Sequence, residues 1–200
     1  MFKFHLYVLF LTGSLLAGAD KEIIIREDFA ATPPEFPITQ KHIVNKDLTL
    51  GLHGDKMNIK KSHHANKKND PHYVWSGLTK SVWAVSLALK DEVSLGERSL
   101  HLSWRTKQSG GRTLYFILQN EEGKWFIYNE GSGDAKDWNE SSFSFDKTKW
   151  SSFDISIVKK GEKLPELNIK SIKSIGFTDL QRGAASKASS RLDWLELRIK

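Results

Sequence analysis

The clearest strand pattern of the chain lies in three segments, RSLHLSWRT (residues 98–106), RTLYFILQ (112–119) and KWFIYN (124–129), separated by QSGG (108–111) and NEEG (120–123). Side chains of different character alternate along these segments, and a period of two is that of a β-strand, whose successive side chains point to opposite faces. The two Gly-containing quartets are turn signals. We therefore expect a three-stranded antiparallel β-meander.

Short strand-like segments also occupy most of the remaining chain, and helical periodicity is nearly absent. Strands are expected at residues 22–26, 48–52, 82–89, 141–145, 152–158, 169–177 and 191–199, and residues 53–71 are expected to form a long polar excursion. About ten strands in a chain of this length predict an all-β, two-sheet antiparallel jelly-roll β-sandwich, with residues 20–200 as a single domain.

Residues 1–19 have the pattern of a signal peptide. Lys3 precedes an apolar run, Leu6–Leu11, and Ala17-Gly18-Ala19 fits an Ala-x-Ala cleavage site. We predict export to the periplasm or the medium, with no membrane span after cleavage; an uncleaved membrane anchor is the alternative. The chain has no Cys, which excludes thiol catalysis, Cys-ligated zinc and a lipid-anchored lipoprotein.

The charge pattern argues against nucleic acid as a partner. The chain has 30 Lys and Arg against 24 Asp and Glu, a formal net charge of +6, but the two signs are interspersed along its whole length. The densest basic string, residues 56–68, is typical of a solvated loop. Weak attraction to acidic polysaccharide or to a membrane surface stays open.

Alternation assigns one face of the meander to the core. Leu100, Leu102 and Trp104 share a face, which Leu114, Phe116, Leu118, Trp125 and Ile127 can join. Trp83, Trp104 and Trp125 are therefore interpreted as packing residues.

The opposite face of the same strands combines aromatic rings with polar tips. It carries His101, Ser103, Arg105, Tyr115, Ile117, Gln119, Phe126 and Tyr128. Sugars offer CH patches that pack on rings and hydroxyls that need donors and acceptors. We predict a shallow glycan groove with the ligand-binding residues His101, Arg105, Tyr115, Gln119 and Tyr128, joined by Tyr73 and Trp75 from the preceding loop. The alternative is that residues 53–72 cover this face and that its rings form a second small core.

Catalytic signatures are sparse. No GxSxG elbow occurs, and the inferred groove shows no facing carboxylates. His101, Arg105, Tyr115 and Tyr128 fit a polysaccharide lyase in kind, which stays the enzymatic alternative; a cell-surface protein-interaction module is a third. His64, Asp70 and His72 could converge on a metal only if residues 65–69 form a turn, and no HExxH occurs.

The C-terminal strings KSIGFTD (173–179) and SRLDWLEL (190–197) resemble the closing strands of carbohydrate-binding jelly rolls of the galactose-binding-like type. SHH, DPHYVWSG, WRTKQSGGR and GFTDL together resemble an uncharacterised family of secreted bacterial proteins, which implies no activity. The jelly-roll resemblance implies a structural calcium held by Asp193 with Glu27 or Asp28. Partners for Asp193 among Arg191, Arg26 or backbone amides are the alternative.

These patterns together predict a secreted, non-catalytic protein that binds a polysaccharide or glycoconjugate on one sheet face.

Overall fold

The computed structural model describes residues 22–69, 72–77, 79–181 and 188–200. Its strands are β1 (Ile23–Glu27), β2 (Leu48–Gly54), β3 (Lys60–His63), β4 (His72–Trp75), β5 (Trp83–Ser94), β6 (Leu100–Ser109), β7 (Leu114–Asn120), β8 (Trp125–Ser132), β9 (Asn139–Ser144), β10 (Trp150–Asp154), β11 (Lys159–Lys163), β12 (Ser171–Asp179) and β13 (Ser189–Ile199). Two short 3-10 helices, η1 (Gln40–His42) and η2 (Lys56–Asn58), complete the described elements.

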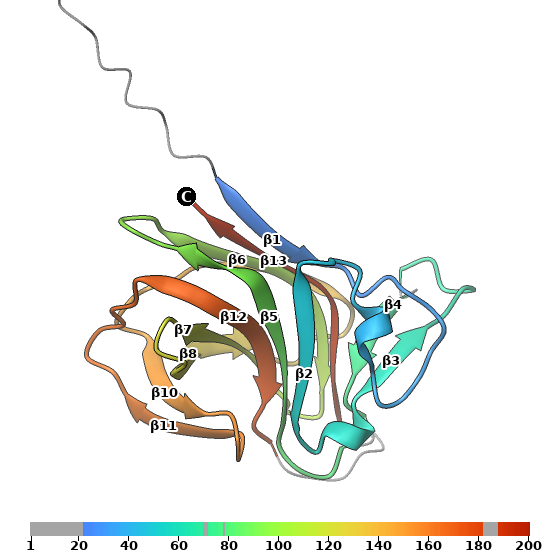
Figure 1. The fold of residues 1–200 in the computed structure, drawn as a ribbon. Helices are drawn as coiled ribbons and strands as arrows, with labels where there is room; N and C mark the ends of the chain where they lie inside the picture. Colours follow the sequence, from blue (N-terminus) through green and yellow to red (C-terminus); the bar gives the residue numbers. More distant parts are fainter. Residues whose placement is uncertain (1–21, 70–71, 78, 182–187) are drawn as a thin grey trace, which may run out of the picture.

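The strands form two antiparallel sheets that pack face to face (Figure 1). Sheet A has the order β3-β4-β13-β6-β9, and β1 also pairs with β13. Sheet B has the order β11-β10-β8-β7-β12-β5-β2. The predicted all-β, jelly-roll β-sandwich is confirmed.

The core lies between the sheets. Trp83 and Phe177 contribute from sheet B, and Trp104 and Leu195 contribute from sheet A; each is at most 1% exposed. The two faces interdigitate, so burial of these apolar side chains drives the stacking of the sheets. Trp83 and Trp104 are packing residues, as predicted.

The predicted meander of three consecutive strands is wrong. β6 belongs to sheet A, between β13 and β9, whereas β7 and β8 belong to sheet B. Gly110 and Gly111, with φ of 74° and 75°, turn the chain out of sheet A. Arg112 follows them, fully buried, and its Nη1 donates to the Asp179 carboxylate at 2.7 Å. Because Asp179 ends β12, this ion pair directs the chain to the place where β7 pairs with β12.

The predicted orientation of β8 is also wrong. Phe126 and Tyr128 face the main core, and Ile127 faces outward. The outward face of β8 is buried too, because Ile155 and Val158 of the β10–β11 turn pack over Ile127 and its neighbours in a second apolar cluster. Trp125 lies in this second cluster, partly exposed, and not in the main core. Alternation cannot orient a strand when both of its faces are apolar.

Residues 53–71 are not a simple excursion. They include the end of β2, η2 and β3, and β3 pairs with β4 in the register Ser62↔Tyr73. Within its described part, β3 thus extends sheet A, and the carbonyl oxygen of Asn69 reaches the outer face of the sheet, where it accepts a hydrogen bond from Arg105. The predicted signal peptide, residues 1–19, lies outside the described residues. No helix in the described part of the chain is long and apolar enough to cross a membrane.

We predict that Asp179→Ala lowers the free energy of unfolding by about 3–5 kcal/mol, because it leaves the Arg112 charge buried without its partner. Both side chains of the pair are 1% exposed. Urea unfolding measures the change. The control is Asp47→Ala, which removes a solvent-exposed partner of Lys90 at 3.9 Å and should cost less than about 1 kcal/mol. Equal losses in the two variants would contradict the organising role of Asp179.

Candidate functional site

Four of the predicted ligand-binding residues lie on the outer face of sheet A, called here the sheet A face. His101 and Arg105 project from β6 on the side opposite Leu102 and Trp104. Tyr73 and Trp75 lie on a strand, β4, and not on the predicted loop, and they project to the same side, opposite the core residue Val74. Tyr73 is only 5% exposed, whereas Trp75 is partly exposed.

The other predicted residues lie elsewhere. Tyr115 and Gln119 are on the outer face of sheet B, and Tyr128 is 2% exposed among the rings of the core. The predicted groove across three consecutive strands is therefore wrong, because β6 lies in one sheet and β7 and β8 in the other. The same separation removes the geometric basis for a lyase that uses His101, Arg105, Tyr115 and Tyr128 together.

Arg105 is the centre of one cluster on the sheet A face. Its guanidinium donates to the Asp193 carboxylate and, at 2.7 Å, to the carbonyl oxygen of Asn69. The same group lies 5.0 Å from the ring centroid of Trp138, a cation–π distance. Trp138 in turn packs edge-on against Tyr73, with the ring centroids 5.5 Å apart. Charge pairing and stacking thus hold the Arg105 side chain in one position.

A second cation and ring pair lies across the face. Arg26 of β1 lies over Trp194 of β13, with 4.5 Å from its Cζ to the ring centroid. Arg26 also donates to Glu196 at 3.1 Å and to Asp28 at 2.9 Å. Burial by itself would raise the pKa of Glu196, but hydrogen bonds from Arg198 and Arg26 hold that pKa below its usual range.

Trp138 and Trp194 were not among the residues predicted from the sequence. Trp194 follows Asp193 in β13, and a register shift between Leu192 and Trp194 against β6 interrupts the alternation there. At this irregularity Asp193 does not share the inward face of Leu195, Leu197 and Ile199, and its carboxylate turns to Arg105. Trp138 follows a loop without periodicity, and a lone Trp in a polar loop is the only signal for it.

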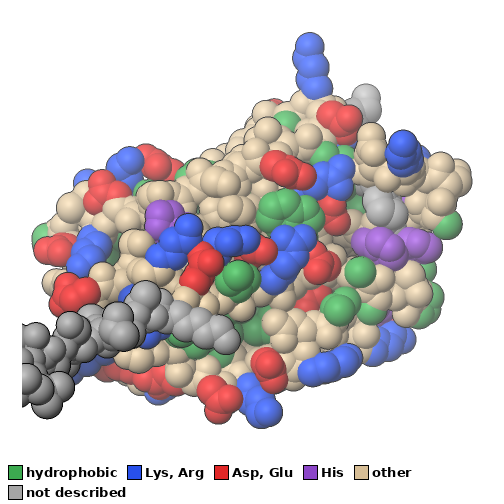
Figure 2. All heavy atoms as spheres, turned by 90° about the horizontal axis from the view of Figure 1, so that it is seen from above, with side chains coloured by type: hydrophobic (Ala, Val, Ile, Leu, Met, Phe, Trp, Pro, Cys, Tyr) green, Lys and Arg blue, Asp and Glu red, His purple; other side chains and the backbone are tan. Residues whose placement is uncertain are grey.

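The far end of the face is polar. The imidazole of His101 shares hydrogen bonds of 3.0 Å with the hydroxyl groups of Ser99 and Ser144. The Ser103 and Ser142 hydroxyls are 2.9 Å apart in the next row. In the view of Figure 2, Lys and Arg side chains alternate with Asp and Glu side chains around hydrophobic ones. Cations and carboxylates are thus mixed on this face, and neither sign dominates it.

The β3–β4 hairpin borders the face and holds unusual basic groups. Lys60 lies 5.7 Å from the ring centroid of Trp75. On the inner side, the Lys61 ammonium is fully buried and donates to the carbonyl oxygen of Ser62. Burial lowers the pKa of Lys61 to about 8, although the carboxylates of Asp193 and Glu27 oppose this effect. Burial, with Lys61 and His63 nearby, also lowers the pKa of His72.

The residues implied as calcium ligands do not fit a calcium ion. Asp193 pairs with Arg105, and Asp28 pairs with Arg26. The Glu27 carboxylate accepts backbone N–H groups of Phe29, Val44 and Asn45 at 2.6–3.1 Å. Oxygens that accept N–H bonds face donors, whereas calcium needs 6–8 free oxygen ligands. Ion pairs and backbone amides, the alternative to calcium, therefore hold these carboxylates. The partner of Asp193 is Arg105, however, and not Arg191 or Arg26.

The histidine-rich segment shows no metal geometry either. The rings of His63 and His72 stack at 4.5 Å, while the Nδ1 atom of His64 lies 3.2 Å from the Tyr73 hydroxyl. Asp70 lies outside the described residues. Among the residues that are described, no group of three or more His, Asp and Glu side chains could hold a metal ion.

No protein-family model matches the sequence, and no curated protein matches it either. Solved structures do match. A variant of the family 29 carbohydrate-binding module CBM29-2 has a TM-score of 0.51 and 12% sequence identity, covering 89% of this chain and 85% of that one. The chain has the β-sandwich fold of carbohydrate-binding modules. A second CBM29-2 variant, complexed with mannohexaose, has a TM-score of 0.51 at 12% identity and covers 89% and 91% of the two chains. At this identity the likeness concerns the fold alone.

We predict that the free energy of unfolding rises between pH 8 and 10.5 because of Lys61. Its pKa is 10.5 unfolded and about 8 folded, so the unfolded chain binds more protons in this window. The cost of burying the ammonium is present below pH 8 and is lost as the pH rises.

Urea unfolding across this range should show that Lys61→Met abolishes a rise of roughly 2–3 kcal/mol. The adjacent, partly exposed Lys60, changed to Met, is the matched control and should keep the rise. An unchanged rise in Lys61→Met would show that Lys61 stays charged in the folded protein throughout.

Proposed function

We propose that this protein binds a polysaccharide or glycoconjugate, without catalysis, on the sheet A face. One observation carries the proposal: three partly exposed Trp rings, Trp75, Trp138 and Trp194, lie on one sheet face, each with a cation stacked against it. Scattered single apolar side chains are ordinary on a protein surface, but aromatic rings interleaved with hydrogen-bonding groups on one face suit a sugar chain.

The arginines of the face favour hydrogen bonding to hydroxyl groups. A guanidinium has five N–H donors, and the bonds of Arg105 to Asp193 and Asn69 leave donors over. The Arg105 side chain is 19% exposed, so part of it reaches solvent. Because ion pairs and ring contacts already hold Arg105 and Arg26 in place, a ligand would meet groups that lose little conformational freedom on binding.

The charge of the face favours a neutral chain over an acidic one. Arg26, Arg105 and Arg198 each pair with at least one carboxylate, and Lys107 pairs with Asp137 at 3.1 Å. An acidic polysaccharide would have to compete with these carboxylates. The hydroxyl groups of a neutral sugar can instead accept hydrogen bonds from the guanidinium N–H groups. They can also donate hydrogen bonds to the carboxylates and to the Ser103 and Ser142 hydroxyls.

The fold and the leader are consistent with this proposal. One protein of similar fold was solved in complex with mannohexaose, so a β-sandwich of this shape can present a sugar-binding surface. The signal-peptide pattern of residues 1–19 supports a role outside the cytoplasm, where polysaccharides and glycoconjugates are exposed.

Removal of the Trp138 ring tests the site. We expect Trp138→Ala to weaken binding of mannohexaose, or of whichever neutral hexasaccharide binds best in a panel, about tenfold, because it removes a stacking surface and the support of Arg105. Isothermal titration calorimetry measures the affinity.

Trp125→Ala is the matched control, since Trp125 is a partly exposed Trp on the outer face of sheet B. It should bind like the unmodified protein. Loss of binding in Trp125→Ala but not in Trp138→Ala would place the site on sheet B and contradict the proposal. Urea unfolding of both variants confirms that each is folded.

A further inference from the structure

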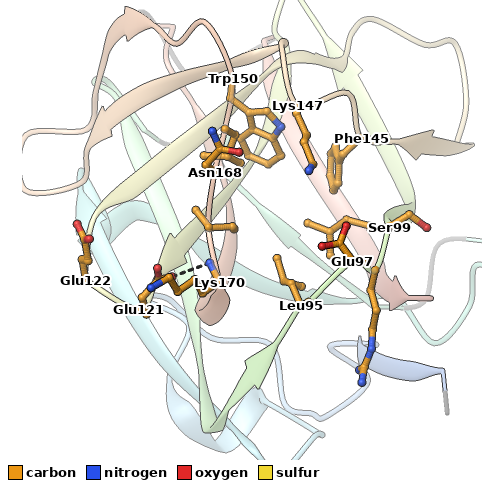
Figure 3. Close-up of a pocket in the computed structure, with 15 residues that line it drawn as sticks. Leu95, Glu97, Ser99, Glu121, Glu122, Phe145, Lys147, Trp150, Asn168 and Lys170 are labelled. Atoms are coloured by element: carbon orange, nitrogen blue, oxygen red, sulfur yellow. Dashed lines mark hydrogen bonds between the residues drawn. The ribbon is translucent and has the colours of Figure 1, made fainter. Parts of the chain in front are cut away.

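A cavity of about 500 Å³ opens at one end of the sandwich, apart from the three Trp rings of the sheet A face. Four connections surround it, and we call it the end pocket: β5–β6 (residues 95–99), β7–β8 (121–122), β9–β10 (145–147) and β11–β12 (167–170). Figure 3 shows its lining side chains arranged around an open space. Pockets that hold small ligands have volumes of about 300–1,000 Å³, so the end pocket is large enough for one.

The inner wall of the end pocket is apolar and rigid. Phe145 and Trp150 line it, and their ring centroids are 5.1 Å apart. Phe145 also stacks on Phe116 at 5.1 Å and packs edge-on against Tyr128 at 4.6 Å. These interlocked rings belong to the core, so the wall is formed before any ligand binds.

The rim carries polar side chains that find no hydrogen-bonding or ionic partner within the described part of the chain. Among the described residues, the side chains of Glu97, Lys147 and Asn168 make no hydrogen bond or ion pair, and all three are exposed. In Figure 3 the Lys147 and Glu97 heads lie on the side of Phe145, and Glu121 and Glu122 lie on the opposite side. A carboxylate, an ammonium and an amide therefore border one cavity, offering acceptors as well as donors.

The balance of these groups selects a class of ligand. Glu97, Glu121 and Glu122 oppose Arg98, Lys147 and Lys170 around the rim, so a strongly charged ligand of either sign meets repulsion. A hydrocarbon would displace water from the polar rim without replacing its hydrogen bonds. A neutral polyol with one apolar face satisfies both parts, because its CH groups can pack on Phe145 and its hydroxyls can bond to the rim.

The end pocket is closed at its inner end, so it can hold the end of a saccharide chain but not its middle. Leu95, Trp150 and Leu167 in its wall are buried side chains of the packed core. A chain that enters from the end of the sandwich cannot continue past them. We propose that the end pocket binds the terminal unit of a neutral saccharide, as a second site that is separate from the sheet A face and does not depend on it.

The seven Trp residues provide reporters for both sites. The chain without the predicted signal peptide, residues 20–200, is labelled with ¹⁵N. It is titrated with neutral saccharides of glucose, mannose, galactose and N-acetylglucosamine, from one to six units long. We expect a saturable shift of the Trp150 indole N–H signal, with an affinity that stops rising by the trisaccharide. Signals of Trp138 and Trp194 report the sheet A face independently, so failure of one site is visible apart from failure of the other.

Variants assign the shift to the end pocket. Glu97→Gln with Lys147→Ala should raise the Kd reported by Trp150 about tenfold, and Asn168→Trp should abolish the shift by filling the cavity. The matched control is Lys160→Ala with Glu162→Gln, the same changes on the exposed edge strand β11, which should leave the Kd unchanged. No shift of Trp150 with any saccharide of the panel would overturn the proposal. An affinity that keeps rising up to the hexasaccharide would contradict binding of a terminal unit. Tighter binding of oligogalacturonate, an acidic saccharide, would contradict the preference for a neutral ligand.

Discussion

The carboxylate of Asp179 is the constraint on which the arrangement of the two sheets depends. It receives Arg112 Nη1 at 2.7 Å, the Ser190 hydroxyl at 2.7 Å and the backbone N–H of Gln181 at 2.9 Å. Asp179 ends β12 in sheet B, Ser190 lies in β13 of sheet A, and Arg112 lies on the crossover between the sheets. One buried anion therefore ties both layers and the chain that passes between them. Few other arrangements are stable, because loss of any partner would leave the buried charge without compensation for its lost hydration.

The position of β6 follows from this crossover, and the sheet A face follows from β6. Because β6 lies beside β13, Arg105 comes next to Trp194 and within reach of the bulged Asp193. β4 pairs with the other edge of the same stretch of β13 and places Tyr73 near Trp138. The aromatic and ionic clusters of the face are thus built from segments far apart in the chain. Their fixed geometry supports the proposal that the face binds a ligand with both CH patches and hydroxyl groups.

The outer face of sheet B is organised differently, although it also carries aromatic side chains. The β10–β11 turn brings Val158, which is 2% exposed and has a φ of 52°, onto Ala84, Ile117 and Ile127. A β-branched residue at positive φ is strained, and this strain is offset by the burial of the second cluster. The exposed edge strand β11 carries Lys159, Lys160 and Lys163, charges that discourage pairing with another sheet edge. The three Trp rings with stacked cations are found on sheet A instead.

The all-β class, most strand positions and the burial of Trp83 and Trp104 were predictable from the residues alone, as was the outward direction of His101 and Arg105. The alternation of side chains is a local property of an extended backbone, so it can be recognised in the sequence of one strand without knowing which strands pair with it. Four features became visible only in the folded chain: β6 and β7 lie in different sheets, Tyr128 faces the core, Asp193 pairs with Arg105, and Trp138 and Trp194 belong to the same face. Strand partners, bulges and the covering of a second face depend on contacts between distant segments, and alternation along one strand carries no information about them.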